Sequence, residues 1–508
     1  MKKRYLTLLL FGSVFTSKAQ SLYQPAVFTD ENRLEKIKSA LPAIEKLVAE
    51  ECKKNNFPGL TYGIVVDGQL VDSHSFGSTN LAQKTAVSSK SLFRIASMTK
   101  SITAMAILKL RDEGKLRLDD PVQQYIPEIK KTPALTVDAP VITIRHLLTH
   151  AAGFPEDNPW GDRQLAIADA YFLKMLGKGV SMSNTPGIAY EYSNMGFAML
   201  GRIITVVTQT PYQEYITKEI LKPLGMNHTV WDFTKVQPDL LAHGYRWENE
   251  KFQEEKLLAD GAYGAMGGLL TSIEDFSKYV SFHLAAWPAR SEAGSGPISR
   301  SSVREMQQPA NFAGLSTSLK ADGKPYSISS AYAYGLRWTR DSDAITTVGH
   351  SGGLPGFGSN WRILPDYGIG VITYVNLTYA NAGMVNTKII DALMASADLK
   401  KRQLPVSKIL QQRKQELVSV FKDWNQASRY PIFAENFFPD KSLALRKKAS
   451  EELFTKAGKI VKISDLIPEN QLRGSFLMEG ERGNIQVYFT LSPENPALIQ
   501  QLDLREVK

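Results

Sequence analysis

The position of the histidines is the feature that most narrows the folds open to this chain. The sequence GHSGG, residues 349–353, fits G-x-S-x-G, the strained strand-to-helix turn that carries the nucleophilic serine of α/β-hydrolases. That fold needs a helix directly after the serine, here Ser351, and an acid and a histidine later in the chain. All seven histidines precede Ser351, and four glycines and a proline in residues 352–361 disfavour a helix. The sequence therefore argues against an α/β-hydrolase elbow at Ser351.

Strand signals near both ends of the first 400 residues predict a different architecture. Residues 57–77 are typical of two strands joined at Asp67-Gly68, a strong hairpin signal. Residues 331–376 alternate β-rich runs with glycine, aspartate and proline, as antiparallel strands do. Apolar periodicity predicts helices at residues 31–55, from residue 97 to near Gly114, after residue 186, and at 382–397. We therefore expect an α+β fold whose N- and C-terminal parts share one sheet.

The composition changes near residue 400, where a charged stretch follows the last apolar helix. We interpret residues 20–400 as one main domain and the segment KKRQLPVSKILQQRKQ, residues 400–415, as a charged connector. Helices are expected at 416–437 and 442–457, followed by strand-like runs up to residue 505. These features predict a separate small α+β domain at 401–508.

The first 19 residues have the organisation of a secretory signal peptide. A basic start is followed by an apolar run from Tyr5 to Thr16 and by a small-x-small ending at residues 17–19. The apolar run is too short for a membrane anchor, and no later stretch is long enough to span a bilayer. The sequence therefore predicts an exported protein, periplasmic or secreted, without a membrane span.

Charge and cysteine content exclude several other functions. The formal net charge is +9, but four of these charges belong to the expected signal peptide and no long basic tract follows. Nucleic acid is therefore not an expected partner. Cys52 is the only cysteine, so neither a disulfide within the chain nor a cysteine-based zinc site is expected.

The sequence SMTK, residues 97–100, offers a second candidate nucleophile. A serine and a lysine three positions apart on a helix lie about 60° apart around its axis and about 4.5 Å along it, so Ser97 and Lys100 can meet. The lysine can act as a base only if burial or neighbouring charge lowers its pKa. A second S-x-x-K match, Ser419 with Lys422, falls inside a charged amphipathic stretch, whereas Ser97 opens an apolar helix. Context therefore favours Ser97.

Two further short motifs could complete such a site. In YSN, residues 192–194, the Tyr192 phenol can relay a proton and the Asn194 amide can hold a substrate carbonyl. In HSG, residues 350–352, a glycine at the end of a β run lets a substrate lie against the strand.

These motifs occur in an order that resembles the serine β-lactamase-like family. That family includes class C β-lactamases, penicillin-binding D-alanyl-D-alanine carboxypeptidases, D-aminopeptidases and related esterases. The similarity extends over about residues 30 to 395. It rests on five ordered segments: FRIASMTKSITAMAILKL, RHLLTHAAGF, YEYSNMGFAMLGRII, GAMGGLLTS and GHSGGLPGFGSNW.

The resemblance implies a role for each motif residue. Ser97 resembles the acylated nucleophile, Lys100 its basic partner, and Tyr192 the general base and acid. Asn194 resembles a ligand of the substrate amide, and His350-Ser351-Gly352 takes the place of the third motif of the family. The same match implies an oxyanion hole formed by the backbone N–H groups of Ser97 and Gly353. No cofactor or metal is implied.

The third motif departs from the family pattern in a way that bears on substrate choice. Class C β-lactamases usually have Lys-Thr-Gly there, and a histidine carries charge only near or below its ordinary pKa of about 6.5. His350 therefore disfavours a dedicated β-lactamase. We expect a peptidase or esterase acting on a small-molecule or peptide substrate, including cell-wall peptides. The alternatives are a β-lactamase or D,D-carboxypeptidase, and a non-catalytic homologue that binds peptidoglycan or peptides.

Other patterns have simpler explanations. His146 and His150 lie four apart on one helical face, but no third metal ligand lies nearby, and the resemblance makes them structural. Gly267-Gly268 is open to two interpretations, a backbone passing close to the site or a tight turn. The tail resembles small domains found behind some relatives of the family, including the NTF2-like cone.

Overall fold

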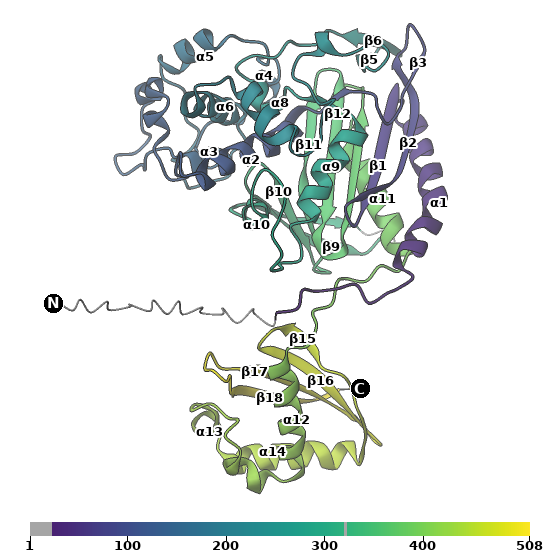
Figure 1. Cartoon of the computed structure of the whole chain (residues 1–508), viewed down its shortest axis with the longest axis vertical. Helices are drawn as coiled ribbons and strands as arrows, with labels where there is room; N and C mark the ends of the chain where they lie inside the picture. The colour runs from purple at the N-terminus through teal and green to yellow at the C-terminus, as the bar shows by residue number, and fades with distance from the viewer. Residues whose placement is uncertain (1–22, 320–322, 508) are drawn as a thin grey trace, which may run out of the picture. The chain divides into compact units, whose positions relative to one another are not determined.

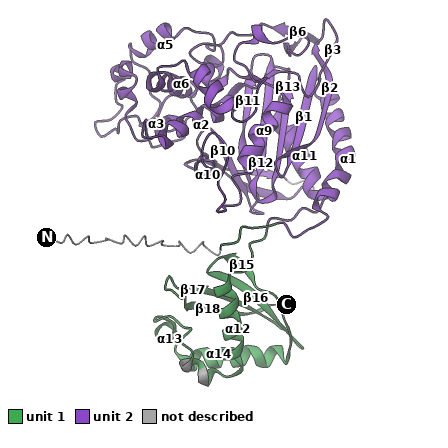
Figure 2. Cartoon of the chain, viewed as in Figure 1, with its two compact units in different colours: residues 1–27, 403–508 green, residues 28–402 purple. Residues whose placement is uncertain are grey.

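The computed structural model describes residues 23–319 and 323–507. Residues 28–402 form one compact unit, and residues 403–508 form another that also includes the described residues 23–27 (Figure 2). The expected signal peptide lies outside the described residues. Within the described ranges, none of the helices has the length and apolar character needed to cross a bilayer.

An antiparallel sheet of nine strands organises the described part of the larger unit (Figure 1). Its order is β3-β2-β1-β13-β12-β11-β10-β9-β8. The strands are β1 (Gly59–Val66), β2 (Gln69–Asn80), β3 (Thr85–Ala86), β8 (Asn311–Leu319), β9 (Pro325–Tyr332), β10 (Arg337–Asp341), β11 (Thr346–Leu354), β12 (Phe357–Leu364) and β13 (Ile369–Val375). Because β1 pairs with β13, the N- and C-terminal parts of the unit share one sheet, which confirms the α+β expectation.

The predicted hairpin forms between β1 and β2. Asp67 and Gly68 have φ angles of +50° and +83°, and a tight turn with two positive φ angles matches the twist of the strands it joins. The aspartate-glycine pair therefore fixes the register of the first two strands.

Helices cover both faces of the sheet. On one face, α1 (Arg33–Lys54) and α11 (Ala382–Ser396) pack on alternate residues of β1, including Leu60, Tyr62 and Ile64. On the other face, α9 (Ile273–Leu284) packs on Ile372 and Tyr374, whereas the alternate β13 residues Val371 and Val375 belong to the first core. The two-residue periodicity of the strands thus divides the apolar side chains between two cores.

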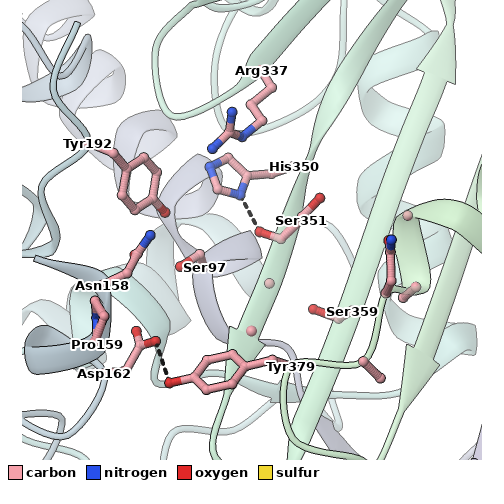
Figure 3. Close-up of a pocket in the computed structure, with 16 residues that line it drawn as sticks. Ser97, Asn158, Pro159, Asp162, Tyr192, Arg337, His350, Ser351, Ser359 and Tyr379 are labelled. Atoms are coloured by element: carbon pink, nitrogen blue, oxygen red, sulfur yellow. Dashed lines mark hydrogen bonds between the residues drawn. The ribbon is translucent and has the colours of Figure 1, made fainter. Parts of the chain in front are cut away.

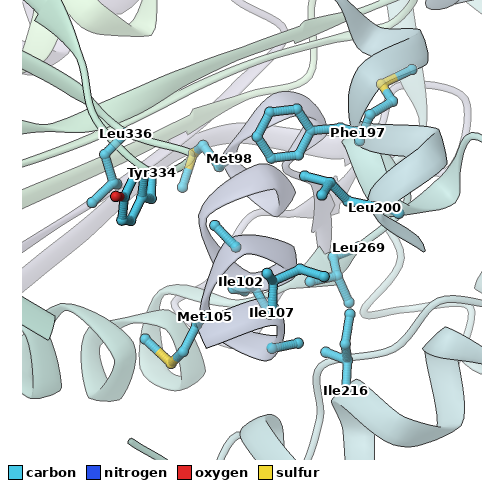
Figure 4. Close-up of a cluster of buried hydrophobic side chains, with 14 of the residues drawn as sticks. Met98, Ile102, Met105, Ile107, Phe197, Leu200, Ile216, Leu269, Tyr334 and Leu336 are labelled. Atoms are coloured by element: carbon cyan, nitrogen blue, oxygen red, sulfur yellow. The ribbon is translucent and has the colours of Figure 1, made fainter. Parts of the chain in front are cut away.

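The helix that follows Ser97, α2 (Thr99–Asp112), lies at the centre of the second core. Its residues from Thr99 to Leu108 are all buried, including the polar residues Thr99, Lys100, Ser101 and Thr103. Figure 4 shows Ile102, Met105 and Ile107 of α2 surrounded by apolar side chains of neighbouring elements. The start of α2 is therefore held in a rigid setting.

Shorter elements complete the larger unit. The helices are α3 (Ile144–Leu148), α4 (Asn158–Gly161), α5 (Asp169–Leu176), α6 (Asn194–Thr208), α7 (Tyr212–Ile216), α8 (Gly264–Gly267) and α10 (Arg300–Met306). The short strands are β4 (Phe93–Arg94) with β7 (Leu270–Thr271), and β5 (Gly244–Glu248) with β6 (Lys251–Glu255).

The smaller unit combines helices with a second antiparallel sheet. It contains α12 (Lys408–Lys422), α13 (Phe437–Asp440), α14 (Leu443–Ala457), β14 (Ile460–Ile463), β15 (Ile467–Asn470), β16 (Arg473–Gly480), β17 (Asn484–Leu491) and β18 (Ile499–Val507). The helix expected at 416–437 was misplaced, since α12 begins at 408, inside the stretch interpreted as a connector. The Ser407 hydroxyl caps α12 by accepting the N–H of Leu410. One face of this helix is buried, at Leu410, Arg413, Lys414, Leu417 and Val420.

Candidate active site

Ser97 lies in a short 3₁₀ turn, η1 (Ala96–Met98), directly before α2. Ala96 has a φ angle of +50°, a left-handed conformation that costs free energy in a residue other than glycine. Such strain is frequently found where a fold must aim a reactive side chain. The turn places Ser97 in a pocket and points α2 with its Lys100 into the core behind it.

The Lys100 ammonium is buried and hydrogen-bonded to three groups. Its Nζ lies 2.9 Å from Ser97 Oγ, 2.7 Å from Asn194 Oδ1 and 3.0 Å from the carbonyl oxygen of Met266. Burial lowers the pKa of Lys100 to about 7, and the carboxylates of Asp162 and Asp157 oppose this shift. The structure therefore brings together the serine and lysine of the first motif, in a setting that lets the lysine lose its proton near neutral pH.

Asn194 is fully buried at the start of α6, and its side chain faces Lys100. Its Oδ1 accepts the Lys100 bond, and its Nδ2 donates to Asn158 Oδ1 at 3.1 Å. Both carboxyl oxygens of Asp157 accept backbone N–H groups of the first turn of α6. In this structure Asn194 holds Lys100, and the neighbouring Asn158 lines the pocket.

Tyr192 forms one wall of the pocket, beside Ser97 (Figure 3). The Lys100 Nζ lies 4.9 Å from the centre of its ring. Burial raises the pKa of Tyr192 well above its ordinary value, although a side-chain hydrogen bond with Ser97 acts in the opposite direction. Tyr192 is therefore a protonated phenol at neutral pH.

His350 is buried on β11, and its hydrogen bonds fix its tautomer. Nδ1 faces the Ser351 carbonyl oxygen, which can only accept, so Nδ1 carries the proton. Nε2 then accepts from the Tyr332 hydroxyl at 2.8 Å. Burial lowers the pKa of His350 well below its ordinary value, and Arg337 and Lys100 lower it further. His350 is thus neutral and supplies no positive charge to the pocket.

Ser351, Gly352 and Gly353 continue β11 along the pocket. No elbow forms, because Ser351 lies within a strand that turns into β12, and its Oγ accepts from Asn360 Nδ2 at 2.8 Å. A Cβ on Gly352 would lie 2.2 Å from the carbonyl oxygen of Ile95. The glycine therefore lets β11 approach the segment that precedes Ser97.

The pocket has a volume of about 480 Å³, within the range of small-molecule sites. The predicted residues on its wall are Ser97, Tyr192, His350, Ser351, Gly352 and Gly353. Lys100 and Asn194 lie directly behind Ser97.

Six charged or hydrogen-bonding residues of the pocket were not found from the sequence: Asn158, Asp162, Arg337, Ser359, Tyr379 and Asn381. Arg337 begins β10 opposite Gly349, and its guanidinium carbon lies 5.7 Å from the centre of the Tyr192 ring. Asp162 follows α4, and Tyr379 follows β13. Arg337 and Asp162 belong to no motif, whereas Tyr379 begins another Y-x-N sequence, residues 379–381, which is more simply explained as the loop after a β run. The other available signal was the place of Arg337 in a strand expected next to the HSG strand.

The histidine pair and the double glycine also have defined places. His146 Nδ1 accepts the N–H of Thr143 and caps α3, and His150 Nδ1 accepts the N–H of Ser193. No group of three or more histidine, cysteine, aspartate or glutamate residues suited to a metal occurs within the described ranges.

Gly267 lies against Ala96, because a Cβ added to this glycine would be 3.5 Å from the nearest backbone atom of Ala96. The backbone at Gly267 therefore does pass close to the site.

Comparison with known proteins agrees with this architecture. The family model described as Beta-lactamase matches residues 44–394, so the chain belongs to the beta-lactamase family. Protein flp of Staphylococcus aureus strain N315 is 29% identical over 377 residues, which are 73% of this chain and 70% of that protein. Beta-lactamase-like protein 4 of Dictyostelium discoideum is 26% identical over 363 residues, 68% of this chain and 61% of that protein.

Two solved structures share the fold. The octameric penicillin-binding protein homologue from Pyrococcus abyssi matches with a TM-score of 0.56 and 23% identity, over 92% of this chain and 98% of that chain. A penicillin-binding protein from Bacillus halodurans matches with a TM-score of 0.53 and 23% identity, over 65% and 94%.

Proposed function

We propose that the protein is a serine hydrolase that cleaves an amide or ester bond through an acyl-enzyme on Ser97. The observation that carries this proposal is the 2.9 Å contact between Ser97 Oγ and a fully buried Lys100. A lysine whose pKa is lowered to about 7 is neutral in a large fraction of molecules at neutral pH. In that form its nitrogen can accept the Ser97 proton as the serine attacks a carbonyl carbon.

Tyr192 suits the second proton transfer. Because its pKa is raised, the phenol keeps its proton and can donate it to the leaving nitrogen or oxygen when the tetrahedral intermediate collapses. The proton taken by Lys100 then returns to Tyr192 through the Ser97 oxygen or water. In the second step water attacks the acyl carbonyl carbon, its proton passes through the Tyr192 hydroxyl to neutral Lys100, and Lys100 gives a proton to Ser97 Oγ as the acyl group is released.

The oxyanion of the intermediate would lie between the backbone N–H groups of Ser97 and Gly353. The close approach of β11 to the segment before Ser97 supports this placement, since Gly352 has no side chain to hold the two apart. Pairing of β10 with β11 ends at Gly349, so the later part of β11 has an edge free of β10. Donors fixed in this way stabilise developing charge without reorganisation.

Arg337 gives the pocket the positive charge that His350 lacks. It lies on the Tyr192 side of Ser97 (Figure 3). Because Tyr192 is the proposed proton donor to the leaving group, that group would depart on this side. Since a guanidinium pairs well with carboxylates, we propose that the leaving group carries a carboxylate, as the C-terminal part of a peptide does. The primary function is therefore that of a peptidase or esterase, with small peptides, including cell-wall peptides, as substrates.

Arg337 also favours a second candidate function. A β-lactamase or D-alanyl-D-alanine carboxypeptidase acts on substrates with a carboxylate on that side, and Arg337 could hold it. Rapid cleavage of a chromogenic cephalosporin, abolished in Ser97→Ala, would establish this alternative.

A serine-reactive fluorophosphonate tests the proposal directly. The probe should label wild-type protein at Ser97, and Ser97→Ala should lose the label. Ser419→Ala is the matched control, because Ser419 belongs to the other S-x-x-K sequence and lies on the exposed face of α12. Labelling at Ser351 would refute the mechanism. The absence of labelling, together with inactivity on ester, D-peptide and β-lactam substrates, would favour a non-catalytic binding protein.

A further inference from the structure

Two aspartates near Ser97 differ in how their carboxylates are used. The oxygens of Asp157 accept the N–H groups of Asn194 and Met195, at 2.6 and 2.9 Å, and so serve the start of α6. The carboxylate of Asp162 accepts one hydrogen bond, from the Tyr379 hydroxyl to Oδ2 at 3.1 Å. Its Oδ1 has no hydrogen-bond partner among the described residues.

The lack of a hydrogen-bond partner at Asp162 Oδ1 is unusual because the residue is almost fully buried. Only 2% of its surface is exposed, yet it lines the pocket that contains Ser97. A buried acceptor without a partner costs free energy, and such groups are rare in folded proteins unless a ligand or water satisfies them. Lys100, the nearby cation, already donates to Ser97, Asn194 and Met266.

The position of Asp162 relates it to one part of the substrate. In Figure 3, Arg337 and His350 lie at one end of the pocket and Asp162 and Tyr379 at the other, with Ser97 between them. In the proposed function, Tyr192 protonates the leaving group, so the Arg337 end receives that group. The acyl part of the substrate must then extend toward Asp162.

We infer that Asp162 is a specificity-determining residue that binds a cationic amino group on the acyl part of the substrate. This inference rests on the proposed function. A buried carboxylate that is held at Oδ2 by Tyr379 and has an unpaired acceptor at Oδ1 matches an ammonium group, which has only donors. Substrates with an amine on the acyl side and a carboxylate on the leaving side, as in a short peptide with a free N-terminus, fit both ends of the pocket.

The protonation state of Asp162 agrees with such a ligand. Burial raises the pKa of Asp162 to about 7, while Lys100 and Tyr379 act against this shift. A bound ammonium group favours the ionised carboxylate in the same way.

Matched pairs of 4-nitrophenyl esters test the inference, because an ammonium group replaces a methyl group within each pair. The pairs are glycinate with propionate and β-alaninate with butyrate. Each kcat/KM is divided by the rate of uncatalysed hydrolysis of the same ester. The wild-type protein should prefer the amino ester by about tenfold or more, the effect of a charge-assisted hydrogen bond.

Asp162→Asn should lower this preference to about one, and Tyr379→Phe should lower it by a smaller factor. Asp169→Asn is the control, because that carboxylate is exposed outside the pocket and the preference should persist. Equal binding of 3-(aminomethyl)phenylboronic acid and 3-methylphenylboronic acid by wild-type protein in calorimetry would overturn the inference. So would a preference that survives in Asp162→Asn.

The outcomes separate the two proposals. Turnover that depends on Ser97 but shows no preference for amino esters overturns only the role of Asp162. Equal loss of activity on both members of a pair in Asp162→Asn shows that the residue acts through Lys100, which also overturns the inference. If wild-type protein neither hydrolyses these esters nor binds either boronic acid, the proposed function fails, and the inference fails with it.

Discussion

Ser97, Lys100 and Asn194 form a buried unit joined by direct hydrogen bonds, whereas Arg337 and Asp162 reach the same pocket from two separate elements. In the first set, the Lys100 nitrogen bonds to three protein groups. In the second, one oxygen of the buried Asp162 carboxylate has no hydrogen-bond partner among the described residues. The difference indicates that the fold fixes the reacting groups, whereas the charged side chains at the two ends of the pocket are available to bind the substrate. Mutations in the two sets should therefore have different effects.

The largest effect is expected from Ser97→Ala. Removal of the nucleophile should lower kcat on any turned-over ester by about 10⁴-fold or more, with little change in the melting temperature. Stopped assays on the purified variant measure the loss. The paired control, Ser419→Ala, should keep full activity, and a Ser97→Ala protein that retains a tenth of wild-type activity would refute the acyl-enzyme on Ser97.

Lys100→Met should lower kcat/KM by about 10³-fold, because the base is lost while the nucleophile remains. In the wild type, Lys100 must be neutral to accept the proton, so kcat/KM should rise with pH through about 7, the value to which burial lowers its pKa. The pH dependence of kcat/KM on a neutral ester measures this rise, the acid limb of the profile. Lys422→Met, in the second S-x-x-K sequence, should leave the profile intact. A wild-type rate that falls between pH 6 and 8 would contradict the role of Lys100.

Gly352→Ala tests the contact between β11 and the nucleophile segment. The new Cβ would lie 2.2 Å from the Ile95 carbonyl oxygen, so β11 must shift, and we expect kcat to fall by about 10²-fold with a loss of about 1–3 kcal/mol in the free energy of unfolding. Gly267→Ala is the matched control, because its Cβ would meet no atom closer than 3.5 Å. Urea denaturation and ester kinetics measure both effects. Equal behaviour of the two variants would show that strand approach is unimportant.

Much of the reacting unit could be predicted from the sequence because its geometry is local. A spacing of three residues at a helix start brings Ser97 to Lys100, and a short loop motif before α6 carries Tyr192 and Asn194. The contact of Asn194 with Lys100 could not be predicted, since 94 residues separate the two positions and the packing of α6 on α2 decides it. The hairpin at Asp67-Gly68 was predictable for the same local reason.

The charged ends of the pocket could not be predicted from the sequence, since no spacing connects their residues. Asp162 and Tyr379 are 217 positions apart and meet only through the fold. Likewise, the start of α12 was missed because its capping serine lies in a charged stretch that resembles a linker. Its apolar face is completed by a sheet far along the chain. Tertiary contacts, rather than local preferences, determine both.

Arg337→Gln should show that the Arg337 end of the pocket binds the leaving group of the substrate. Loss of the guanidinium should lower kcat/KM by about 10- to 100-fold for esters with a carboxylate on the leaving group, and much less for neutral esters of the same size. The ratio of the two kcat/KM values is the readout, measured at low and high salt. Arg340→Gln, further along β10 and outside the pocket, is the control. An unchanged ratio would remove Arg337 from substrate recognition.

The smallest expected effect is that of Asp162→Asn on the pKa of Lys100, because the charge of one residue acts on the other. The Asp162 and Asp157 carboxylates raise the pKa of Lys100, whereas burial and Arg337 lower it. Asp162→Asn removes one of the two opposing charges, so the pKa of Lys100 should fall further and the acid limb of kcat/KM on a neutral ester should move to lower pH. The shift should be a fraction of a pH unit, because Asp162 is itself partly protonated near pH 7. Movement of the limb to higher pH would mean that Asp162 does not act on Lys100 by charge, and its place in the pocket would then concern the substrate alone.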